Sequence, residues 1–333
     1  MRATLIRQWF LCALAVMLAG GLIAGCYLPA VFVEQFLDAI HPAGTTAVVL
    51  FLMSFSLDTS RLRDTLRDPP AVLWGAVVNM GLTPLIAWPL AILQARPDFS
   101  LGLMVAAIAP CTLATASVFT RRAGGNDAIS LLVTLLTNCA CVVVSPLWLG
   151  VILSENSSLD LTGIMSKLGA CVLLPTLLGQ LAQWPPAGQA LSRRHRGVIN
   201  FVSQCLVLLL VLIAAMRGGL MLRDQPSSPA VFALVWLCGS CIAVHAASLA
   251  IGWVGARALR APLADTIAVA FAGSQKTLPI ALFIATQPVI TQQDVPLITF
   301  PLLAFHAGQL LLDAMLADRW AGLTRVQSLS EPR

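Results

Sequence analysis

The chain has 333 residues, of which 58% are hydrophobic and only 11% carry a formal charge, with 20 Lys and Arg against 15 Asp and Glu. Soluble domains carry about 25% charged residues. A mean hydropathy of +0.86 therefore excludes an ordinary soluble enzyme, and it also excludes a disordered chain, which needs low hydrophobicity. Aromatic residues make up 7%, with a single Tyr, which argues against a β-barrel with aromatic girdles. We predict an all-α polytopic membrane protein.

Ten apolar runs of the length of a transmembrane helix predict ten spans, separated by short polar loops. In chain order, the expected spans cover residues 8–28, 42–57, 70–94, 100–120, 127–153, 164–183, 198–221, 229–256, 263–287 and 295–317. The segments between them are too short for a soluble domain. All nine Cys lie in or beside these runs, which is typical of helix packing rather than of a disulfide framework.

The distribution of Lys and Arg orients the spans, because cytoplasmic loops carry an excess of positive charge. With the N-terminus inside and the spans alternating, Lys276 falls within a span, and only Arg96, Lys167, Arg217 and Arg223 fall outside. The other fifteen of the 20 Lys and Arg fall inside. We therefore expect a multi-pass protein of the plasma or inner membrane with both termini in the cytoplasm.

The first span allows a second interpretation. Arg2 and Arg7 precede an apolar run that ends in Ile23-Ala24-Gly25-Cys26, a pattern also found in lipoprotein signal peptides. An even number of spans fits the charge distribution better when this span is retained. Cleavage before Cys26 stays open as the alternative.

Ten spans divide into five and five. Residues 1–153 then form a first five-helix repeat, residues 164–317 form a second, and residues 318–333 form a cytoplasmic tail. An odd number of spans per half inserts the second half upside down relative to the first, which is the inverted-repeat arrangement of many secondary transporters. The fourth span of each half carries a polar, helix-breaking interruption, as such a repeat predicts.

Both interruptions combine helix breakers with polar residues. The fourth span contains Pro110, followed by Thr112, Thr115 and Ser117, and the ninth contains the run Gly273-Ser274-Gln275-Lys276-Thr277-Leu278-Pro279. Irregular backbone at membrane depth persists only inside protein or beside water, so paired interruptions indicate a transport site. A Lys near the bilayer centre costs roughly 2.5–3.5 kcal/mol on insertion scales, and this cost points to a function for Lys276.

Other polar side chains inside the spans are candidates for the same site, although helix–helix hydrogen bonding explains each of them singly. Ser130, Thr134 and Asn138 share one helical face, as do His306 and Gln309. Near the two interruptions, we expect a polar, water-accessible pocket. The expected lining residues are Asn79, Ser117, Thr134 and Gln275, with Thr83 and Thr137 close by.

Two further features receive a structural interpretation. Cys238 and Cys241 lie in one apolar span without a second pair, which does not suit metal or redox chemistry. His245 in the same span is expected to be a packed core histidine. No motif for a cofactor is present, so we expect none.

The two interruptions, the run from Arg121 to Ser130, and Phe305-His306 followed by Gln309-Leu310 resemble the bile acid:sodium symporter superfamily, solute carrier family 10. The resemblance covers nearly the whole chain and is closest to the branch of the human seventh member and of bacterial putative symporters. Its most specific part is Gly273-Ser274-Gln275-Lys276-Thr277, where that branch often has Gly-Ser-Lys-Lys-Ser.

The resemblance implies ten helices in two inverted repeats. It also implies a panel domain from spans 1, 2, 6 and 7 and a core domain from spans 3, 4, 5, 8, 9 and 10, in which the broken fourth and ninth helices cross. In the bile acid branch, two sodium ions lie behind this crossing.

Carried over by position, one sodium ion falls near Ala116, Ser117, Ser130 and Thr134, and the other near Asn79 and the stretch Ala270 to Ser274. Ala270 stands where the bile acid branch has a glutamate that bridges both ions, and hard cations usually take a carboxylate ligand. The resemblance therefore leaves the coupling ion open between sodium and a proton.

We expect a symporter-like secondary transporter that moves a small organic anion by alternating access, and not an enzyme. The positive N-terminal ends of the half-helices at the two breaks suit a carboxylate or sulfate. We expect the lipid bilayer and the anion as partners, and no nucleic acid. Candidate substrate- or ion-binding residues are Asn79, Thr112, Ser117, Ser130, Thr134, Asn138, Ser274, Gln275, Lys276, Thr277, His306 and Gln309.

Lys276 is expected to act as a resident cation where relatives hold sodium, because an ammonium is compact and donates three hydrogen bonds. Its expected partners are the hydroxyls of Ser117 and Thr134 and the unwound backbone. Since burial disfavours the charged form, the amine could release and regain a proton. The alternative is that Lys276 reaches the cytoplasmic interface.

Two other functions stay open from the sequence. One is a non-transporting membrane regulator of ion homeostasis. The other is an intramembrane hydrolase with Ser274 as nucleophile and Lys276 as base, since a buried Lys can serve as a base.

The charge distribution makes the topology testable. Reporter domains fused after Arg96 and Arg223 should lie outside, and those fused after Arg122 and Arg260 should lie in the cytoplasm, because positive loops stay inside. Protease protection of each fusion measures its side. A lipid attached to Cys26 at a new N-terminus would show that the first span is a cleaved signal peptide.

Overall fold

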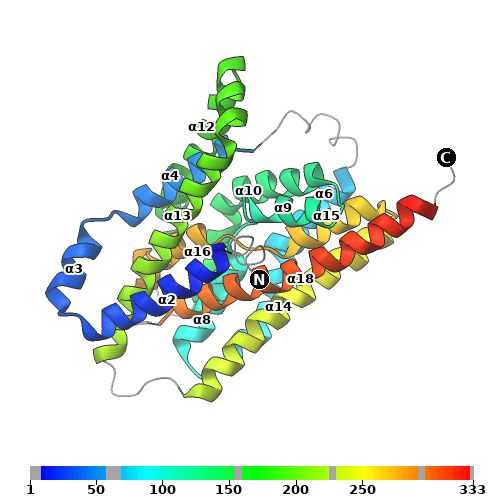
Figure 1. Ribbon diagram of the computed structural model, residues 1–333. Coiled ribbons are helices and arrows are strands. Elements are labelled where there is room, and N and C mark those ends of the chain that lie inside the picture. The colour runs from blue at the N-terminus through cyan, green and yellow to red at the C-terminus, as the bar shows by residue number, and fades with distance from the viewer. Residues whose placement is uncertain (1–8, 58–68, 154–159, 225–229, 292–296, 331–333) are drawn as a thin grey trace.

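The computed structural model describes residues 9–57, 69–153, 160–224, 230–291 and 297–330, and every regular element in these ranges is a helix (Figure 1). The predicted all-α class is confirmed for this part of the chain. Arg2 and Arg7, which helped to orient the spans, lie outside the described residues.

In the first half, π-helical turn η2 joins α6 to α7, so that one continuous helix runs over Pro69–Ile92. Pro stands at the start of α4 and α8, where its fixed φ suits the first turn and its missing amide is not needed. The elements are α2 (Trp9–Tyr27), α3 (Ala30–Asp38), α4 (Pro42–Phe55), α6 (Pro69–Val77), η2 (Val78–Leu82), α7 (Thr83–Ile92), α8 (Pro97–Ile108), α9 (Thr115–Arg122) and α10 (Asp127–Leu153).

In the second half, π-helical turn η3 joins α11 to α12 in the same way. The elements are α11 (Leu161–Leu168), η3 (Gly169–Leu173), α12 (Leu174–Gln183), α13 (Pro186–Asp224), α14 (Val231–Ala258), α15 (Leu263–Ser274), α16 (Leu278–Ala285), α17 (Pro288–Thr291) and α18 (Thr299–Ser330). Helix α13 begins before the predicted residue 198, and α18 continues into the expected tail, 318–333. Hydropathy marks only the stretch that lipid covers, whereas helix-forming polar residues continue a helix into water.

Seven helices among the described residues are long and apolar enough to cross a membrane, which confirms a polytopic membrane protein. Helices α3 and α4 qualify together as one further span bent by 48°, and Cys12–Tyr27 and Pro97–Ile108 are shorter apolar helices. The predicted second span, 42–57, missed α3, because Glu34, Gln35 and Asp38 interrupt its apolar run.

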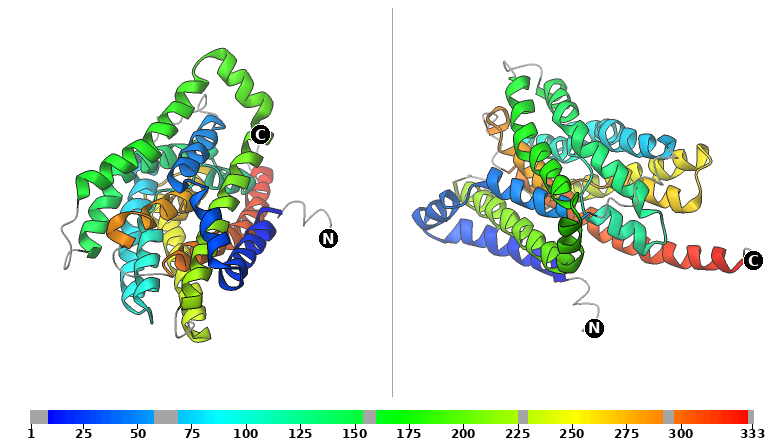
Figure 2. Two further views of the ribbon diagram at one scale, coloured as in Figure 1. Left: turned by 90° about the vertical axis from the view of Figure 1, so that its left-hand side faces the viewer. Right: turned by 90° about the horizontal axis from the view of Figure 1, so that it is seen from above.

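The helices pack in two groups. In the first group, α2 lies along α13, and α4 packs on α12 and α13 (Figures 1 and 2). In the second group, α15 is surrounded by α6, α9, α10 and α14, while α18 packs on α8 and α14. The span Leu263–Ala285, which contains the ninth-span interruption, is buried throughout. Contacts of α16 with α4 and α13 join the two groups.

Small residues let α2 and α13 approach each other closely. Gly21 and Gly25 lie one turn apart on α2; Ala215 of α13 faces Gly21, and Gly219 of α13 faces Gly25. A Cβ atom at Gly25 would overlap the carbonyl oxygen of Met216, and one at Gly219 would overlap that of Leu22. Because lipid supplies no hydrophobic force between helices, such small-residue contacts carry membrane helix packing.

The α2–α13 contact predicts unequal effects for two neighbouring glycines. Gly25→Leu should lower the melting temperature in detergent, because overpacking a tight contact costs about 1–3 kcal/mol. Gly20→Leu is the matched control, since a Cβ atom at Gly20 has no neighbour within 4 Å. Equal melting temperatures for the two variants would contradict the contact.

Candidate functional site

The two predicted interruptions are breaks in the helices, and they lie in contact. Helix α8 ends at Ile108 and α9 begins at Thr115, while α15 ends at Ser274 and α16 begins at Leu278. The backbone becomes extended at Ala109 and at Gln275, with ψ of 150° and 141°. The amide of Thr277 donates to the carbonyl of Pro110 at 2.9 Å. One backbone hydrogen bond thus joins the breaks.

Gln309 satisfies the backbone of the second break. Its Oε1 accepts from the Lys276 amide at 2.8 Å, and its Nε2 donates to the Lys276 carbonyl at 2.8 Å. The same Nε2 lies 3.0 Å from Nδ1 of His306. A side-chain amide has a donor and an acceptor, so it can replace both partners that a helix would have supplied. The predicted pair His306 and Gln309 therefore supports the break from α18.

Two asparagines satisfy other carbonyls freed at the breaks. Asn138 Nδ2 donates to Cys111 O at 2.9 Å, and Thr137 accepts from the Cys111 amide at 3.2 Å. On the other side, Asn79 Nδ2 lies within hydrogen-bond distance of three carbonyls, those of Ala272, Gly273 and Gln275. Buried polar groups away from water need such partners.

Lys276 lies at the centre of the crossing and is 3% exposed. Its ammonium donates to the carbonyl oxygen of Asn79, to Asn79 Oδ1 at 3.2 Å and to Ala109 O at 2.9 Å. All three donor positions are therefore used. The prediction that Ser117 and Thr134 bind this ammonium is wrong, because the side chain of Lys276 turns toward η2 and the end of α8. Burial also excludes the alternative that Lys276 reaches the interface.

The first position implied for sodium keeps free oxygens. The hydroxyls of Ser117 and Ser130 are buried and have no hydrogen-bond partner, whereas Thr134 donates to Thr112 O at 3.3 Å. These residues lie on α9 and α10, which pack together. In the described parts of the chain, no group of three His, Cys, Asp or Glu side chains could hold a metal ion. Two free hydroxyls alone are a weak cation site.

The second position implied for sodium does not fit a metal ion. The carbonyls there accept from the Asn79 amide, and Asn79 Oδ1 accepts from Lys276. Ala270 packs in an apolar cluster with Leu249, Phe271 and Ala317, which gives no ligand where the bile acid branch has a glutamate. Donor groups fill this position in place of a cation.

The remaining predicted residues have local roles that argue against hydrolysis. Ser274 Oγ donates to Ala270 O at 2.8 Å, so its hydroxyl turns back to its own helix while the Lys276 amine binds carbonyls. Nucleophile and base do not meet, as a hydrolase requires. Thr112 Oγ1 lies 2.9 Å from that of Thr115 and accepts from the Thr115 amide at the start of α9.

A buried carboxylate, which the sequence analysis missed, joins this centre. Asp313 on α18 is 0% exposed, and Gln275 Nε2 donates to its Oδ2 at 2.6 Å. Gln275 Oε1 in turn accepts from the Thr115 hydroxyl at 2.7 Å, so this side chain connects both breaks. Asp313 lies one turn beyond Gln309, which lies one turn beyond His306, and this spacing in an apolar run would have revealed it.

His245 is the second missed residue. It is fully buried, as expected of a core histidine, but it is not merely packed. Its Nε2 lies 2.8 Å from Asp313 Oδ1, and its Nδ1 lies 3.2 Å from the carbonyl oxygen of Ser274. The prediction of a buried core histidine is therefore confirmed, and these two hydrogen-bond contacts are what the sequence did not indicate. Nothing in the sequence around His245 indicates this contact, because its partners lie on other helices.

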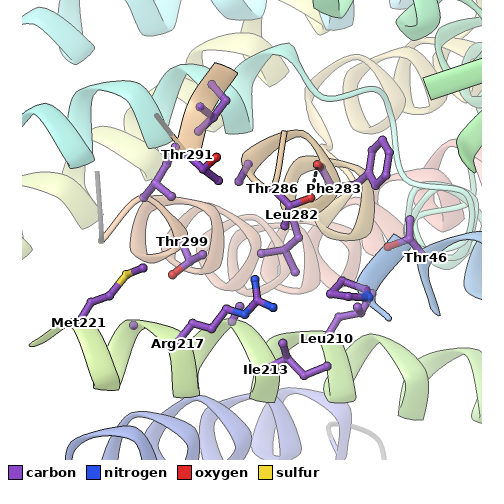
Figure 3. A pocket seen from close by; sticks show the side chains of 16 residues that line it. Thr46, Leu210, Ile213, Arg217, Met221, Leu282, Phe283, Thr286, Thr291 and Thr299 are labelled. Carbon is purple, nitrogen blue, oxygen red and sulfur yellow. Dashed lines mark hydrogen bonds between the residues drawn. The ribbon is translucent and has the colours of Figure 1, made fainter. Parts of the chain in front are cut away.

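A separate cavity of about 220 Å³ lies where the two helix groups meet. Helices α4 and α13 form one wall, and α16, α17 and α18 form the other. Most of the lining is apolar, and Figure 3 shows the guanidinium of Arg217 directed into the cavity from α13. Within the described residues, Arg217 has no acidic partner. The sequence analysis counted Arg217 with the outside residues, near the end of the expected span 198–221, but it did not predict this cavity.

The geometry brings several of the candidate residues together in one place. Asn79, Gln275, Lys276 and Gln309 meet at the crossing of the breaks, with Asp313 beside them. All of these are buried, and so are Ser117 and Thr134. The expected water-accessible pocket is therefore closed at the crossing in this conformation, and none of the candidate residues lines the separate cavity.

Comparisons with known proteins point to transport. A model of the SBF-like CPA transporter family matches residues 8–322, and this confirms the resemblance to the bile acid:sodium symporter superfamily. Sodium/bile acid cotransporter 7 from Rattus norvegicus is 22% identical over 285 residues, which cover 81% of this chain and 80% of that protein.

Two other relatives have similar names. Sodium/bile acid cotransporter 7-A from Xenopus laevis is 24% identical over 258 residues, or 74% of this chain and 68% of that protein. The probable sodium/metabolite cotransporter BASS4 of chloroplasts from Arabidopsis thaliana is 24% identical over 297 residues, or 83% of this chain. The match covers 65% of the Arabidopsis protein, which is less than two thirds of its length.

The cavity lining is exposed at Thr286 and the crossing is buried, so single cysteines placed at the two sites should react at different rates. In a background without the nine native Cys, Thr286→Cys should react rapidly with a water-soluble thiol reagent, because Thr286 lines the cavity and is exposed. Thr134→Cys should react slowly, because Thr134 is fully buried. Labelling rates measured by mass spectrometry test this prediction, and a reversed order would contradict the closed crossing.

Proposed function

This chain belongs to the SBF-like CPA transporter family and is a polytopic membrane transporter, and we propose that it carries a small organic anion by alternating access. The observation that carries the proposal is the cavity between the two helix groups, with Arg217 as a cation directed into it. An apolar wall with one fixed cation suits an anion that has an apolar body and one carboxylate or sulfonate.

The size and chemistry of the cavity support this substrate class. A cavity of about 220 Å³ is larger than the ~150 Å³ that holds benzene in a protein core. Thr46, Thr286 and Thr299 add hydroxyls to the lining. The Thr286 hydroxyl donates to Phe283 O, whereas the Thr299 hydroxyl has no partner among the described residues and could donate to the same anionic group. The names of relatives, which include bile acids and metabolites, agree with an organic solute.

We propose ten spans in two inverted five-helix repeats, residues 1–153 and 164–317. Seven apolar helices, the bent pair α3–α4 and the shorter helices α2 and α8 add up to this number. The breaks between α8 and α9 and between α15 and α16 occupy matching places in the two halves. The distribution of Lys and Arg supports a cytoplasmic location of both termini.

We assign α2, α3–α4, α11–α12 and α13 to a panel domain and the other spans to a core domain. The packing of α2 on α13 and of α4 on α12 and α13 supports this division. The cavity has one wall from each domain. Motion of the core against the panel would therefore widen or close the cavity, as alternating access requires.

We also propose that Lys276 is a resident cation and that sodium does not drive transport. Its ammonium fills the place of the second sodium ion and is held by three oxygens from η2 and α8. A carboxylate ligand is lacking at Ala270, which lies in an apolar cluster. The relatives named as sodium cotransporters supply the competing expectation that sodium is required.

Arg217 provides the test of the anion cavity. In a thermal-shift screen of alkanesulfonates and alkanoates, an anion that binds raises the melting temperature, because it stabilises only the folded protein. For a compound found in this way, Arg217→Gln should weaken binding roughly 10- to 100-fold, since a hydrogen bond to a charged group contributes about 1.5–3 kcal/mol.

Arg223→Gln is the matched control for this test. Arg223 lies on the same helix, but its guanidinium donates to Leu28 O and faces away from the cavity lining. Uptake of the same anion into proteoliposomes should follow binding in both variants. A folded protein that neither binds nor moves any tested anion would favour a non-transporting regulator of ion homeostasis.

Lys276 provides the test of the coupling ion. Uptake of 1-hexanesulfonate by the wild-type protein should be the same with and without sodium, and Lys276→Ala and Lys276→Gln should slow it at least about tenfold, which is a barrier of ~1.4 kcal/mol. Lys167→Gln is the control, since Lys167 is an exposed residue of α11. Strong sodium stimulation together with normal uptake by Lys276→Ala would overturn the proposal.

A further inference from the structure

A histidine and a carboxylate meet in the interior of the helix bundle. His245 on α14 and Asp313 on α18 are both 0% exposed, and Nε2 of the ring lies 2.8 Å from Oδ1 of the carboxylate. On its other side, the ring directs Nδ1 at the carbonyl oxygen of Ser274, 3.2 Å away. The ring edge packs on Phe305, with centroids 6.2 Å apart.

Hydrogen-bond accounting assigns one shared proton to this pair. A backbone carbonyl only accepts, so Nδ1 must carry a hydrogen to bond to Ser274. A neutral imidazole has one N–H, so Nε2 then has a lone pair that faces Asp313. The contact at 2.8 Å is a hydrogen bond only if a further proton lies between Nε2 and Oδ1.

Two arrangements place that proton, and both leave the pair without net charge. Either the ring is an imidazolium beside a carboxylate, or the ring is neutral and Asp313 is a carboxylic acid that donates to it. Without this proton, a net negative charge would be buried and two lone pairs would face each other, which is costly away from water. Ser274 O is also at the C-terminal end of α15, where a positive ring is favoured.

We propose that the His245–Asp313 pair is the proton-binding site of this transporter and that a proton is carried together with the anion. This inference rests on the proposed transport of an organic anion. The proton enters from the aqueous phase, binds between Nε2 and Oδ1, and leaves to the aqueous phase on the other side. No other bond changes.

Hydrogen bonds link the pair to both broken helices. Asp313 Oδ2 accepts from Gln275 Nε2 at 2.6 Å, and Gln275 Oε1 accepts from the Thr115 hydroxyl at the start of α9. Gain or loss of the proton changes the charge of Asp313 or of its partner, and so changes the strength of the bond to Gln275. The protonation state of the pair therefore changes the strength of a hydrogen bond at the crossing itself.

The charge of Lys276 gives the direction of coupling. With the proton bound, the pair is neutral and the ammonium is the unbalanced charge at the crossing. With the proton lost, the negative pair balances Lys276. The centre is therefore positive only when protonated, and a positive centre in a low-dielectric interior favours an anion. Proton and anion are then favoured together, which is symport.

Few other titratable groups face the pair from the described helices packed on it. Those near the breaks are Lys276, Cys111 and His306, and none of them hydrogen-bonds to His245 or Asp313. Asp265 is in the first turn of α15, at the opposite end from Ser274. Arg122 and Asp318 pair with each other between α9 and α18.

Asp313→Asn tests the proton site without a substrate. Its amide can donate to His245 and accept from Gln275, so the variant imitates the protonated state and should fold. During titration of the folded, detergent-solubilised full chain from mildly acidic to alkaline pH, the wild-type protein should release one more proton per chain than Asp313→Asn. Asp318→Asn, on the same helix but exposed, should match the wild-type count. Equal counts for wild type and Asp313→Asn would overturn the proton site.

Proteoliposomes that contain a pH-sensitive dye test the coupling. A gradient of 1-hexanesulfonate, which stays ionised and does not carry protons through lipid, should drive proton movement by the wild-type protein. Asp313→Asn should exchange labelled 1-hexanesulfonate but move no protons. Wild-type uptake without proton movement would overturn the coupling and leave anion transport intact. If no variant moves 1-hexanesulfonate, the proposed transport of this anion fails, and the proton count alone decides the site.

Discussion

A backbone carbonyl or amide that leaves a helix inside a membrane must find a partner within the protein, because lipid offers none. Much of the centre of this molecule follows from that constraint. Gln309 pairs with both backbone groups of Lys276, Asn138 pairs with Cys111, and Asn79 pairs with the end of α15. Amide side chains suit this task, since each offers a donor and an acceptor. The breaks are therefore fixed and not loose.

Fixed breaks in turn determine where charge can be placed. The extended backbone around Gln275 directs the next side chain, Lys276, at carbonyl oxygens of η2 and α8. Asp313, a carboxylate bonded to the crossing, does not pair with this ammonium but bonds to His245 and Gln275. The Lys276 ammonium and the Asp313 carboxyl group thus share one buried region but have different hydrogen-bond partners. In low dielectric, a change in one affects the other strongly.

The chain matches its family over most of its length, but its residues at the implied sodium site differ from those of the bile acid branch. Relatives at 22–24% identity are named as sodium cotransporters, and the family match covers residues 8–322. Yet the resemblance places Ala270, which packs against apolar side chains, where the bile acid branch has a bridging glutamate. A fold survives such a change because helix packing depends on volume and hydrophobicity. A cation site depends on individual oxygens, and so the proposed independence from sodium is compatible with the shared family.

Hydropathy and charge alone determined the broad class, since spans of about 20 apolar residues have few other uses. The same sequence revealed both interruptions, because Pro110 and the polar run from Ser274 to Thr277 are rare inside apolar spans. Membrane insertion makes such exceptions costly, and so they are visible without a structure.

Contacts between distant helices could not be found in this way. His245 and Asp313 are 68 positions apart, and Lys276 lies 197 positions from its partner Asn79. Nor does the sequence show that Arg217 meets a cavity formed by α16 and α18. Periodicity reports which residues share the face of one helix, but not which face of another helix lies opposite. Only the packing of the helices decided which polar groups meet, and therefore where a cation, a proton and an anion can be held.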